Sequence, residues 1–365
     1  DDYVEVTTFR VDGEYLDHRR PESVRYANNL ADDLSRRDFT INAMAYNAKI
    51  GIVDNYGGQK DLFRQIIRSV GNPCIRFDED ALRIIRAMRF ASELGFEIDQ
   101  PTANAIHEMK SLLLNVSSER LAKEFELLIM GSAPANILGT FADVFGTLFP
   151  EILPCVGFDQ HSRYHIYDVW KHTAVAVENS ISDREVRLAL FFHDIAKPLV
   201  FTRDENGEGH FKGHAQLGAE MTEKIMERLR YDKKTIKLTC ALIDRHSDTI
   251  STEKQIRRLA AKLGNDAFFL LMEVKKADNL AKNEFTLAEN ASFDQYADRL
   301  RELIAEESCF SLRQLAVNGR DLMQIGIYGQ QIGKILNTLL GLVIDGELPN
   351  DREKLMERAA KEAEL

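Results

Sequence analysis

A stripe of acidic and basic residues between positions 77 and 90 has the clearest chemical potential in this sequence. Helical spacing places four charged side chains next to one another: Asp80, Arg83, Arg86 and Arg89. Apolar residues flank the stripe, so we predict one largely buried helix over residues 77–90, and buried charges need partners or a function. An ordinary Asp80–Arg83 ion pair and a ligand site are both compatible with this spacing.

A second charged motif, Arg36-Arg37-Asp38, precedes an apolar stretch that we predict as a helix over residues 39–46. Arginines at a helix N-terminus are unfavourable for the helix dipole, which prefers anions there. The same position suits a triphosphate, because helix N–H groups and guanidinium groups converge on it. In the alternative interpretation, Asp38 caps the helix and both arginines are solvated.

Histidines form the third feature. Most of the nine fall in one block of the chain: His161, His165, His172, His193, His210, His214 and His246. His193 and Asp194 are adjacent at the end of a strongly apolar helical segment, residues 187–192. A buried His–Asp pair needs a metal ion or an ionic partner.

The elements that position these residues are mainly helices. Strand patterns occur only within about the first 56 residues, at residues 4–10, near Tyr15 and at residues 50–54. Further helices are predicted over residues 61–69, 101–109, 118–130 and 134–148, and a boundary at Pro150 and Pro154. We therefore predict a mainly α protein with a small N-terminal α+β part.

Composition narrows the class of protein. The chain has 365 residues, enough for two or three domains, of which 44% are hydrophobic and 29% charged. We find no membrane span or signal peptide, and the four scattered cysteines form no CxxC pair, so we expect a cytoplasmic protein with reduced thiols. The net charge of −11 disfavours nucleic acid over the whole surface but permits a local basic cleft.

Several long motifs follow one another in order: RRDFTINAMAYN at residues 36–47, DLFRQIIRSVGNP at 61–73 and FDEDALRIIRAMRF at 77–90. Together with VEVTTFRVDGEYLDHRRPESV at 4–24, they resemble the bacterial class II tRNA nucleotidyltransferases, the CCA-adding enzymes and their poly(A) polymerase relatives. The resemblance covers at least residues 3–100, and the order of its motifs makes it specific. It implies a truncated nucleotidyltransferase palm followed by a helical neck and body.

The resemblance also implies roles for individual residues. Arg37 is expected to contact nucleotide phosphates, and the EDxxR element at residues 79–83 is expected to select the incoming base. The remaining nucleotide-binding residues implied are Asp38, Asn42, Arg86 and Arg89. The substrates implied are CTP, ATP and the 3′ end of tRNA.

Hydrogen bonding supports the base-selecting role of Asp80 and Arg83. A carboxylate only accepts and a guanidinium only donates. Cytosine and adenine both present an exocyclic amine to Asp80 and a neighbouring ring nitrogen to Arg83. Guanine and uracil present a carbonyl where Asp80 needs a donor, so unpaired buried groups would reject them.

The family's metal-binding DxD carboxylates and the Gly-rich motif before them are not found in this sequence. The chain opens within a strand pattern and lacks an initiator Met, so we expect these carboxylates, with the Mg²⁺ that they hold, upstream of Asp1 in the natural protein. A polypeptide beginning at Asp1 is expected to be inactive in nucleotidyl transfer. Asp78 and Asp80 are no substitute, and Glu5 is either an assisting carboxylate or an ordinary strand residue.

The histidine block resembles the HD superfamily of metal-dependent phosphohydrolases. The matching positions are His172, His193, Asp194 and Asp278, with His214 and His246 matching the extra histidines of two-metal members. Mixed imidazole and carboxylate ligands favour Mg, Mn, Ni or Fe over structural zinc, and Lys197 is placed to steady a phosphate. The resemblance implies phosphatase or 2′,3′-cyclic phosphodiesterase activity, which suits repair of RNA 3′ ends.

A glycine-punctuated turn near the C-terminus resembles the tail of HD-containing CCA enzymes, which reaches along the tRNA. Its candidate RNA contacts are Gly326, Gly329, Gly333 and Lys334. Glycines that open a helix offer backbone N–H groups to phosphates. A helix-to-helix turn that needs glycine conformations is an equal alternative.

We divide the chain into a partial palm (residues 1–60), a helical neck and body with the template (61–153), an HD-type all-α domain (154–285) and a helical tail (286–365). The expected function is addition of CCA to tRNA 3′ ends. The alternatives are an HD phosphohydrolase as the only activity of this chain, a poly(A) or A-adding polymerase, and a non-catalytic tRNA-binding fragment. The oligomeric state stays open.

Overall fold

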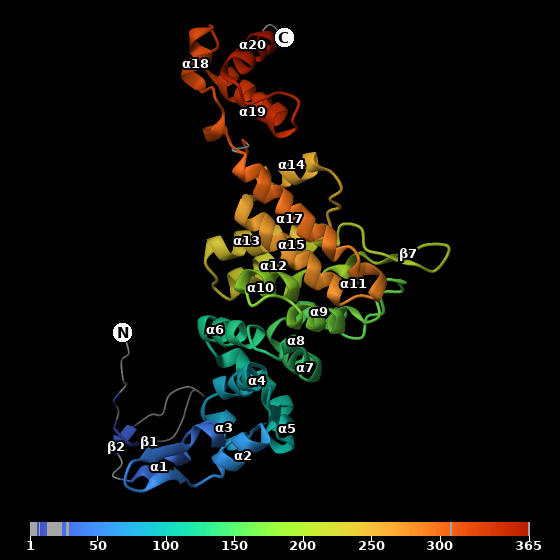
Figure 1. The fold of residues 1–365 in the computed structure, drawn as a ribbon. Helices are drawn as coiled ribbons and strands as arrows, with labels where there is room; N and C mark the ends of the chain where they lie inside the picture. Colours follow the sequence, from blue (N-terminus) through green and yellow to red (C-terminus); the bar gives the residue numbers. More distant parts are fainter. Residues whose placement is uncertain (1–5, 7, 13–23, 27–28, 307–308, 364–365) are drawn as a thin grey trace.

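The computed structural model describes residues 6, 8–12, 24–26, 29–306 and 309–363. This part of the chain is elongated and mainly helical, with the N-terminal strands at one end and the C-terminal helices at the other (Figure 1). The predicted fold class is confirmed. Within these ranges, no helix combines the length and the apolar character that a membrane span requires.

Short paired strands and two helices make up the N-terminal part. Strand β1 (Arg10–Asp12) pairs antiparallel with β2 (Val24–Tyr26), and β3 (Met44–Asn47) pairs antiparallel with β4 (Gly51–Asp54). The helices are α1 (Leu30–Ser35) and α2 (Gly58–Arg64), and β5 (Ile66–Ile67) pairs parallel with β6 (Glu97–Ile98). The strand predicted at residues 50–54 is confirmed, whereas the one predicted at 4–10 falls largely outside the described residues.

The predicted helix over residues 39–46 is wrong. Helix α1 forms earlier, because the Asn29 side chain accepts the Ala31 N–H and caps it. Arg36 and Arg37 therefore follow the C-terminus of α1, where the dipole favours cations. Only a 3₁₀ turn, η1 (Thr40–Asn42), precedes strand β3. A helix N-terminus thus contributes nothing to anion binding at this motif.

The single helix predicted over residues 77–90 is interrupted at Asp80. Helix α3 (Pro73–Glu79) ends there, Asp80 is extended with φ −141° and ψ 102°, and α4 (Leu82–Leu94) follows. The Asp80 carboxylate accepts the Leu82 N–H at 3.2 Å, which satisfies a backbone donor that the start of a helix leaves open. Asp80 therefore lies at a helix junction and not on a helix face.

The helical neck contains α5 (Gln100–Met109), α6 (Ser118–Ile129), α7 (Pro134–Thr140) and α8 (Ala142–Leu148), with the 3₁₀ segments η2 (Lys110–Asn115) and η3 (Pro150–Cys155). The predicted helices at 101–109 and 118–130 are confirmed, while the one at 134–148 is divided at Phe141. The helix predicted at 61–69 ends at Arg64, because Gln65 adopts a left-handed conformation with φ 58°.

The histidines belong to a helical block whose main members are α9 (Val169–Glu178), α10 (Arg184–Phe192), α12 (His214–Arg228), α13 (Lys233–Arg245), α14 (Glu253–Leu263), α15 (Asn265–Leu280) and α17 (Asn290–Ala305). Between them lie α11 (Lys197–Val200), α16 (Glu284–Leu287) and the projecting hairpin of β7 (Thr202–Arg203) and β8 (Gly209–His210). Helix α17 packs along α15 (Figure 1). It therefore belongs with this block in packing, although we grouped residues 286–305 with the tail.

The C-terminal helices α18 (Gly319–Gln324), α19 (Gln330–Ile344) and α20 (Arg352–Ala363), with the 3₁₀ turn η4 (Leu312–Gln314), form a second, smaller hydrophobic core. Ion pairs connect this core to α14, with Arg258 2.6 Å from Asp345 and Lys254 2.9 Å from Glu347. The tail is thus a separate packing unit held to the histidine block partly by surface charge.

Buried aromatic rings join the neck to the histidine block. Phe125 of α6 packs edge-on against Phe191 of α10 with 4.8 Å between ring centroids, and Phe149 lies 5.1 Å from Phe125. Beside them, the buried Arg187 of α10 donates from one guanidinium nitrogen to the carbonyls of Ile129 and Gly131 at 2.6 and 2.7 Å. Arg187 therefore satisfies carbonyl groups that the C-terminus of α6 leaves open.

Replacing Arg187 with Met is expected to lower the free energy of unfolding by about 2–4 kcal/mol, because buried carbonyl groups lose charged donors. Arg228→Met is the matched control, since it also removes a bridge between these units, the half-exposed pair with Glu151. Its expected effect is below about 1 kcal/mol. Urea unfolding followed by circular dichroism measures both. Equal losses in the two variants would show that Arg187 has no special role at this joint.

Candidate functional site

A cavity of about 480 Å³, which we call the N-terminal cavity, opens between the Arg36–Asn42 segment and the start of α4. Its lining consists of Arg36, Arg37, Asp38, Asn42, Asp80, Arg83 and Arg86. The structure thus brings together every predicted nucleotide-binding residue except Arg89, and adds Arg36. Four arginines against two aspartates give the lining a net positive charge, which favours a polyanionic ligand. Glu5 lies outside the described residues.

Core packing holds the Arg36–Asn42 segment in place. The fully buried Phe39 packs edge-on against Phe90 of α4, with ring centroids 5.7 Å apart. The next residue, Thr40, donates its hydroxyl to the buried Asp61 at 2.7 Å. These contacts fix the backbone that directly follows Asp38, so the motif is attached to a rigid support next to α4.

The Asp80 carboxylate is held at both oxygens. Oδ1 accepts the Leu82 N–H, and Oδ2 lies 3.5 Å from a guanidinium nitrogen of Arg120 on α6. The sequence did not identify Arg120, because nothing in its local pattern connects α6 with residue 80. Asp80 is therefore oriented by two elements, with its carboxylate at the cavity wall.

Arg83 is buried and firmly placed. One terminal nitrogen donates to Glu79 at 2.7 Å and to the Arg76 carbonyl at 3.1 Å, and the other donates to the Arg36 carbonyl at 2.7 Å. The ordinary Asp80–Arg83 ion pair is therefore wrong, since Arg83 pairs with Glu79 and Asp80 with Arg120. Because a guanidinium carries five N–H donors, these three bonds leave donors of Arg83 for a ligand in the cavity.

Arg86 and Arg89 have different surroundings. Arg86 donates to Asp38 at 2.6 and 3.1 Å, so Asp38 binds Arg86 and does not cap a helix. Arg89 lies outside the cavity lining, with Nε 2.7 Å from the buried Glu124 and its guanidinium 3.8 Å from the Phe90 ring centroid. Arg89 thus supports α4 from behind the site. Glu124, which sequence reasoning missed, also lies 3.6 Å from Arg86.

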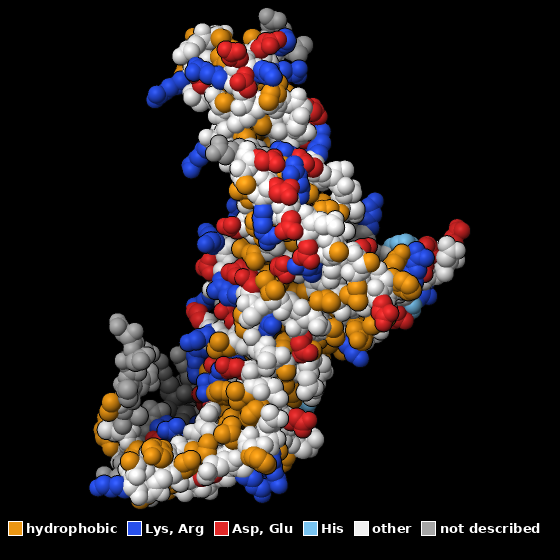
Figure 2. Space-filling view, viewed as in Figure 1, with side chains coloured by type: hydrophobic (Ala, Val, Ile, Leu, Met, Phe, Trp, Pro, Cys, Tyr) orange, Lys and Arg blue, Asp and Glu red, His pale blue; other side chains and the backbone are white. Residues whose placement is uncertain are grey.

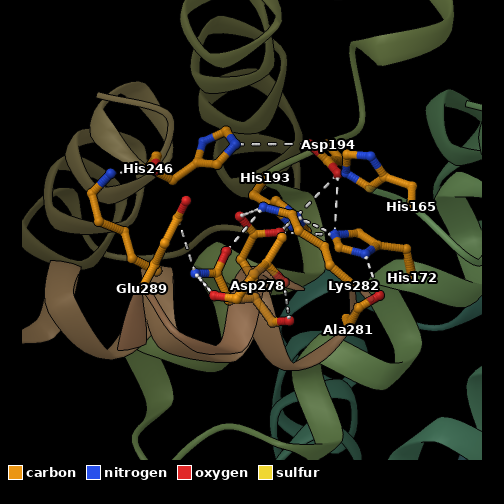
Figure 3. Close-up of polar contacts among 12 residues, drawn as sticks. His165, His172, His193, Asp194, His246, Asp278, Ala281, Lys282 and Glu289 are labelled. Atoms are coloured by element: carbon orange, nitrogen blue, oxygen red, sulfur yellow. Dashed lines mark hydrogen bonds and ion pairs between the residues drawn. The ribbon is translucent and has the colours of Figure 1, made fainter. Parts of the chain in front are cut away.

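The six predicted metal ligands converge in the histidine block. Five of them are labelled in Figure 3: His172, His193, Asp194, His246 and Asp278. His172 comes from α9, His193 and Asp194 follow α10, His214 begins α12, His246 follows α13 and Asp278 lies near the end of α15. Two ligand groups share the Asp194 carboxylate: His172, His193 and Asp194 form one, and Asp194, His214 and His246 form the other. Asp278 joins the first group, with Oδ1 3.0 Å from Nε2 of His172.

Each imidazole of the cluster is oriented by a backbone carbonyl. Nδ1–H donates to Ala281 from His172 at 3.1 Å, and to Leu190, Phe211 and Ile243 from His193, His214 and His246, each at 2.7 Å. Because a carbonyl only accepts, the proton of each neutral ring lies on Nδ1 and the Nε2 lone pair is directed into the cluster. This second set of contacts is characteristic of metal-binding histidines.

Asp194 is the central carboxylate. It is 1% exposed, and neither oxygen receives a hydrogen bond of normal geometry, although Nζ of Lys197 lies 2.7 Å from Oδ2. Oδ2 is 3.1 Å from His193, and Oδ1 is 3.5 Å from His214. A buried carboxylate bordered by four imidazole nitrogens would suit divalent metal ions, which these side chains could hold. The donor set therefore fits the metal dependence that the sequence predicts.

The pKa shifts of three of the four histidines favour the neutral imidazole that binds a metal ion. Burial lowers the pKa of His172 and His246, and lowers that of His214 to about 4. Burial also opposes a charge on His193, but the adjacent Asp194 outweighs it and raises the pKa of His193 to about 9. Burial opposes ionisation of Asp194 as well, yet His193 and Lys197 hold its pKa well below the usual range. Most of these rings are thus neutral beside an ionised carboxylate near pH 7.

A cavity of about 610 Å³, the histidine cavity, opens onto this cluster. Besides Asp194, His214, His246 and Asp278, cationic and polar side chains line it: His165, Lys197, His210, Lys275 and Lys282. Lys282 pairs with Asp278 at 2.7 Å, and Lys197 lies 3.4 Å from Nε2 of His165. Lys275 and Lys282 were not identified from the sequence, because their helix positions alone do not distinguish them from surface lysines.

The C-terminal glycines serve a turn in this structure. Gly326 and Gly329 have φ of 88° and 63°, which favours glycine, and Gly329 precedes α19. Gly333 and the exposed Lys334 lie in the first turns of α19. The turn alternative therefore accounts for two of the glycines, while RNA contact by this segment stays a prediction.

Side chains of Lys and Arg follow the left-hand edge of the molecule beside its bend, mixed with Asp and Glu (Figure 2). Local basic surface thus coexists with the net charge of −11. A long anionic ligand would find counter-charges along this edge without a uniformly basic protein.

Comparisons with known proteins match the parts of the chain that contain the two cavities. A family model described as the poly A polymerase head domain matches residues 1–68, and the HD domain model matches residues 163–283. A third model, described as the probable RNA and SrmB-binding site of polymerase A, matches residues 95–154. The fold and these matches therefore define a nucleotidyltransferase joined to an HD domain.

Relatives that match almost the whole chain identify the family to which it belongs. The CCA-adding enzymes of Bacillus velezensis and Pediococcus pentosaceus are 31% and 32% identical to this chain, over 98% of it and 79% of each relative. The crystal structure of the Bacillus stearothermophilus CCA-adding enzyme in complex with CTP is similar in fold, with a TM-score of 0.72, 24% identity and coverage of 98% and 78% of the two chains. The chain belongs to the CCA-adding enzymes, which are tRNA nucleotidyltransferases. This outcome favours CCA addition over the other functions considered from the sequence.

Proposed function

We propose that Asp80 and Arg83 select the base of the incoming nucleotide, and that Arg37 and Arg86 bind its phosphates. The supporting observation is the single cavity of about 480 Å³ that these side chains share. Asp80 would accept the exocyclic amine of cytosine or adenine, while Arg83 donates to the adjacent ring nitrogen. Guanine and uracil place a carbonyl opposite Asp80, and the unpaired buried acceptors disfavour their binding.

The rigidity of this pair supports the selective role. Glu79 and the Arg36 carbonyl hold Arg83, and Arg120 and the Leu82 N–H hold Asp80. Side chains fixed before the ligand arrives discriminate better, because they cannot rotate to satisfy a mismatched base. Arg37 is half-exposed at the cavity, a position that suits a phosphate more than a base.

The ligands follow from the relatives. One structure shows the Bacillus stearothermophilus enzyme with CTP, and another shows the Thermotoga maritima enzyme complexed with tRNA, the latter with a TM-score of 0.52, 20% identity and coverage of 92% and 74%. We propose that this chain binds CTP, ATP and the 3′ end of tRNA. Incorporation of labelled CTP and ATP into tRNA that lacks CCA tests the proposal, and an intact enzyme that incorporates neither would contradict it.

Divalent metal is expected for nucleotidyl transfer, and Mg²⁺ is the ion we propose. The carboxylates of the N-terminal cavity do not suit it, because Asp38 is engaged by Arg86 and Asp80 by Leu82 and Arg120. We therefore assign Mg²⁺ no ligand among the described residues.

We further propose that the histidine cavity hydrolyses phosphoesters. The ligands would be His172, His193, Asp194, His214, His246 and Asp278, holding a pair of Mg, Mn, Ni or Fe ions. Such ions activate water and neutralise phosphate charge. Lys197, fixed by Asp194 and the side-chain oxygen of Gln160 at 2.7 Å each, lies at the cavity wall and would bind a phosphate oxygen.

Hydrolysis of a 2′,3′-cyclic nucleotide by the full chain with added Mn²⁺ tests this second activity. His193→Ala is expected to lower kcat/KM by more than the roughly 10–100-fold that loss of an outer-shell partner costs, because it removes a ligand itself. His107 of α5, which pairs with Asp143 and lies outside the lining of the histidine cavity, provides the matched control as His107→Ala. Equal rates for the wild type and His193→Ala would show that the metal cluster takes no part in the reaction.

A further inference from the structure

One wall of the histidine cavity comes from α17 and from the residue that precedes it. The four residues that line the cavity are Glu289, Ser292, Phe293 and Tyr296. Their spacing is that of one helical face, so they present a continuous surface to the cavity. Phe293 and Tyr296 are half-buried, with ring centroids 6.3 Å apart in an edge-on arrangement. This wall is aromatic with polar groups at one end.

The wall differs in character from the rest of the cavity. In Figure 3, Glu289 lies on the His246 side of the metal cluster, while His165 lies on the opposite side near His172. The cationic groups Lys197 and Lys282 belong to the floor, where they pair with Asp194 and Asp278. The cavity therefore combines a floor suited to a phosphate with a wall suited to an uncharged ring.

Lys275 supports this wall instead of adding a free charge to it. Its Nζ donates to the carbonyls of His246 and Asp248 at 2.6 Å each, and it lies 5.8 Å from the Phe293 ring centroid. These bonds tie the segment after α13 to α15. Thr249 and Ile250 of that segment line the same cavity, so this part of the lining is also held in place.

The HD domain match ends at residue 283, before α17 begins at Asn290. The matched segment thus supplies the metal ligands, and a helix outside it supplies the aromatic wall. A separately contributed wall is the part of such a cavity that would determine which organic group accompanies the phosphate.

We propose that Phe293 and Tyr296 bind the nucleoside of a single nucleotide whose phosphoester lies at the His/Asp cluster. The inference rests on the phosphohydrolase activity proposed above. The rings stack on the base or the ribose, and Ser292 and Glu289 are placed to hydrogen-bond its hydroxyl or amino groups. In the reaction, a water oxygen bonds to phosphorus, one phosphorus–oxygen bond of the cyclic ester breaks, and the released oxygen is protonated to a hydroxyl.

Two substrates distinguish the role of the aromatic wall from that of the metal cluster. Both are five-membered cyclic phosphodiesters: 2′,3′-cyclic AMP carries a nucleoside, and ethylene phosphate does not. With the full chain and Mn²⁺, Tyr296→Leu is expected to lower kcat/KM for cyclic AMP by about 10–100-fold, mainly through KM. The rate on ethylene phosphate is expected to change by less than about threefold, because the metal cluster is untouched.

Two further variants test whether a loss of activity comes from misfolding. Tyr296→Phe retains the ring and is expected to keep most activity on cyclic AMP, while Gln295→Ala, an exposed change on the same helix, is expected to alter neither substrate. Equal losses on both substrates in Tyr296→Leu and Phe293→Leu would overturn the nucleoside wall while leaving the hydrolase in place. A wild type that hydrolyses neither substrate would overturn the hydrolase and the wall with it.

Discussion

Replacing Asp80 with Ala is expected to reduce the preference for CTP over UTP by roughly 100-fold or more during addition to tRNA. In the wild type, uracil places its carbonyl against the Asp80 carboxylate, and two acceptors face each other without a proton. The Ala variant removes that repulsion for UTP and removes a hydrogen bond for CTP. The ratio of kcat/KM values therefore falls from both sides, while tRNA affinity is expected to stay within about threefold.

The measurement is competition among the four nucleoside triphosphates for incorporation into tRNA that lacks CCA. Asp78→Ala is the matched control, because Asp78 is exposed and lies outside the N-terminal cavity. It is expected to preserve the selection of C and A. An unchanged preference for CTP over UTP in Asp80→Ala would show that Asp80 does not select the base. Its hydrogen bond at the start of α4 and its contact with Arg120 would then be the roles that remain for it in the structure.

Replacing Asp194 with Asn is expected to abolish both metal positions of the histidine cavity, because this carboxylate belongs to both ligand groups. Elemental analysis after dialysis against Mn²⁺ should give about two ions per chain for the wild type and less than one for Asp194→Asn. His214→Ala removes a ligand of only one group and should retain about one ion. Hydrolysis of the cyclic nucleotide is expected to fall by roughly 1000-fold or more in Asp194→Asn.

Asp204→Asn provides the matched control for that series. Asp204 lies in the exposed β7–β8 hairpin and pairs with His210 at 3.0 Å, away from both ligand groups. The same chemical change there should leave the metal content unchanged. Equal metal content in Asp194→Asn and the wild type would contradict a site built around Asp194.

The six metal ligands could be predicted because the histidine block resembles the HD superfamily, whereas the residue pattern alone pointed only to the adjacent His193 and Asp194. His193 and Asp194 follow a run of buried residues in α10, whereas His246 follows the amphipathic α13. The aromatic wall was not predictable, since Phe293 and Tyr296 read as ordinary core residues of an amphipathic helix. Only the packing of α17 on α15 brings them to the cavity.

The N-terminal cavity shows where local patterns mislead. Helical periodicity continues through residue 80, but the Asp80 side chain binds the Leu82 N–H and ends the first helix. Side-chain competition for backbone donors of this kind is invisible to a periodicity argument. Likewise, the apolar character of residues 39–46 comes from the burial of Phe39 against Phe90 and from the β3–β4 hairpin, not from a helix.

The central claim is that Asp80 and Arg83 together hold the base edge of the incoming nucleotide. A crystal structure of this protein with CTP tests it most directly. We expect a carboxylate oxygen of Asp80 at about 2.7–3.1 Å from N4 of cytosine, and a guanidinium nitrogen of Arg83 at a similar distance from N3. A cytosine edge bound by other side chains, with Asp80 and Arg83 in contact only with Arg120 and Glu79, would contradict the account.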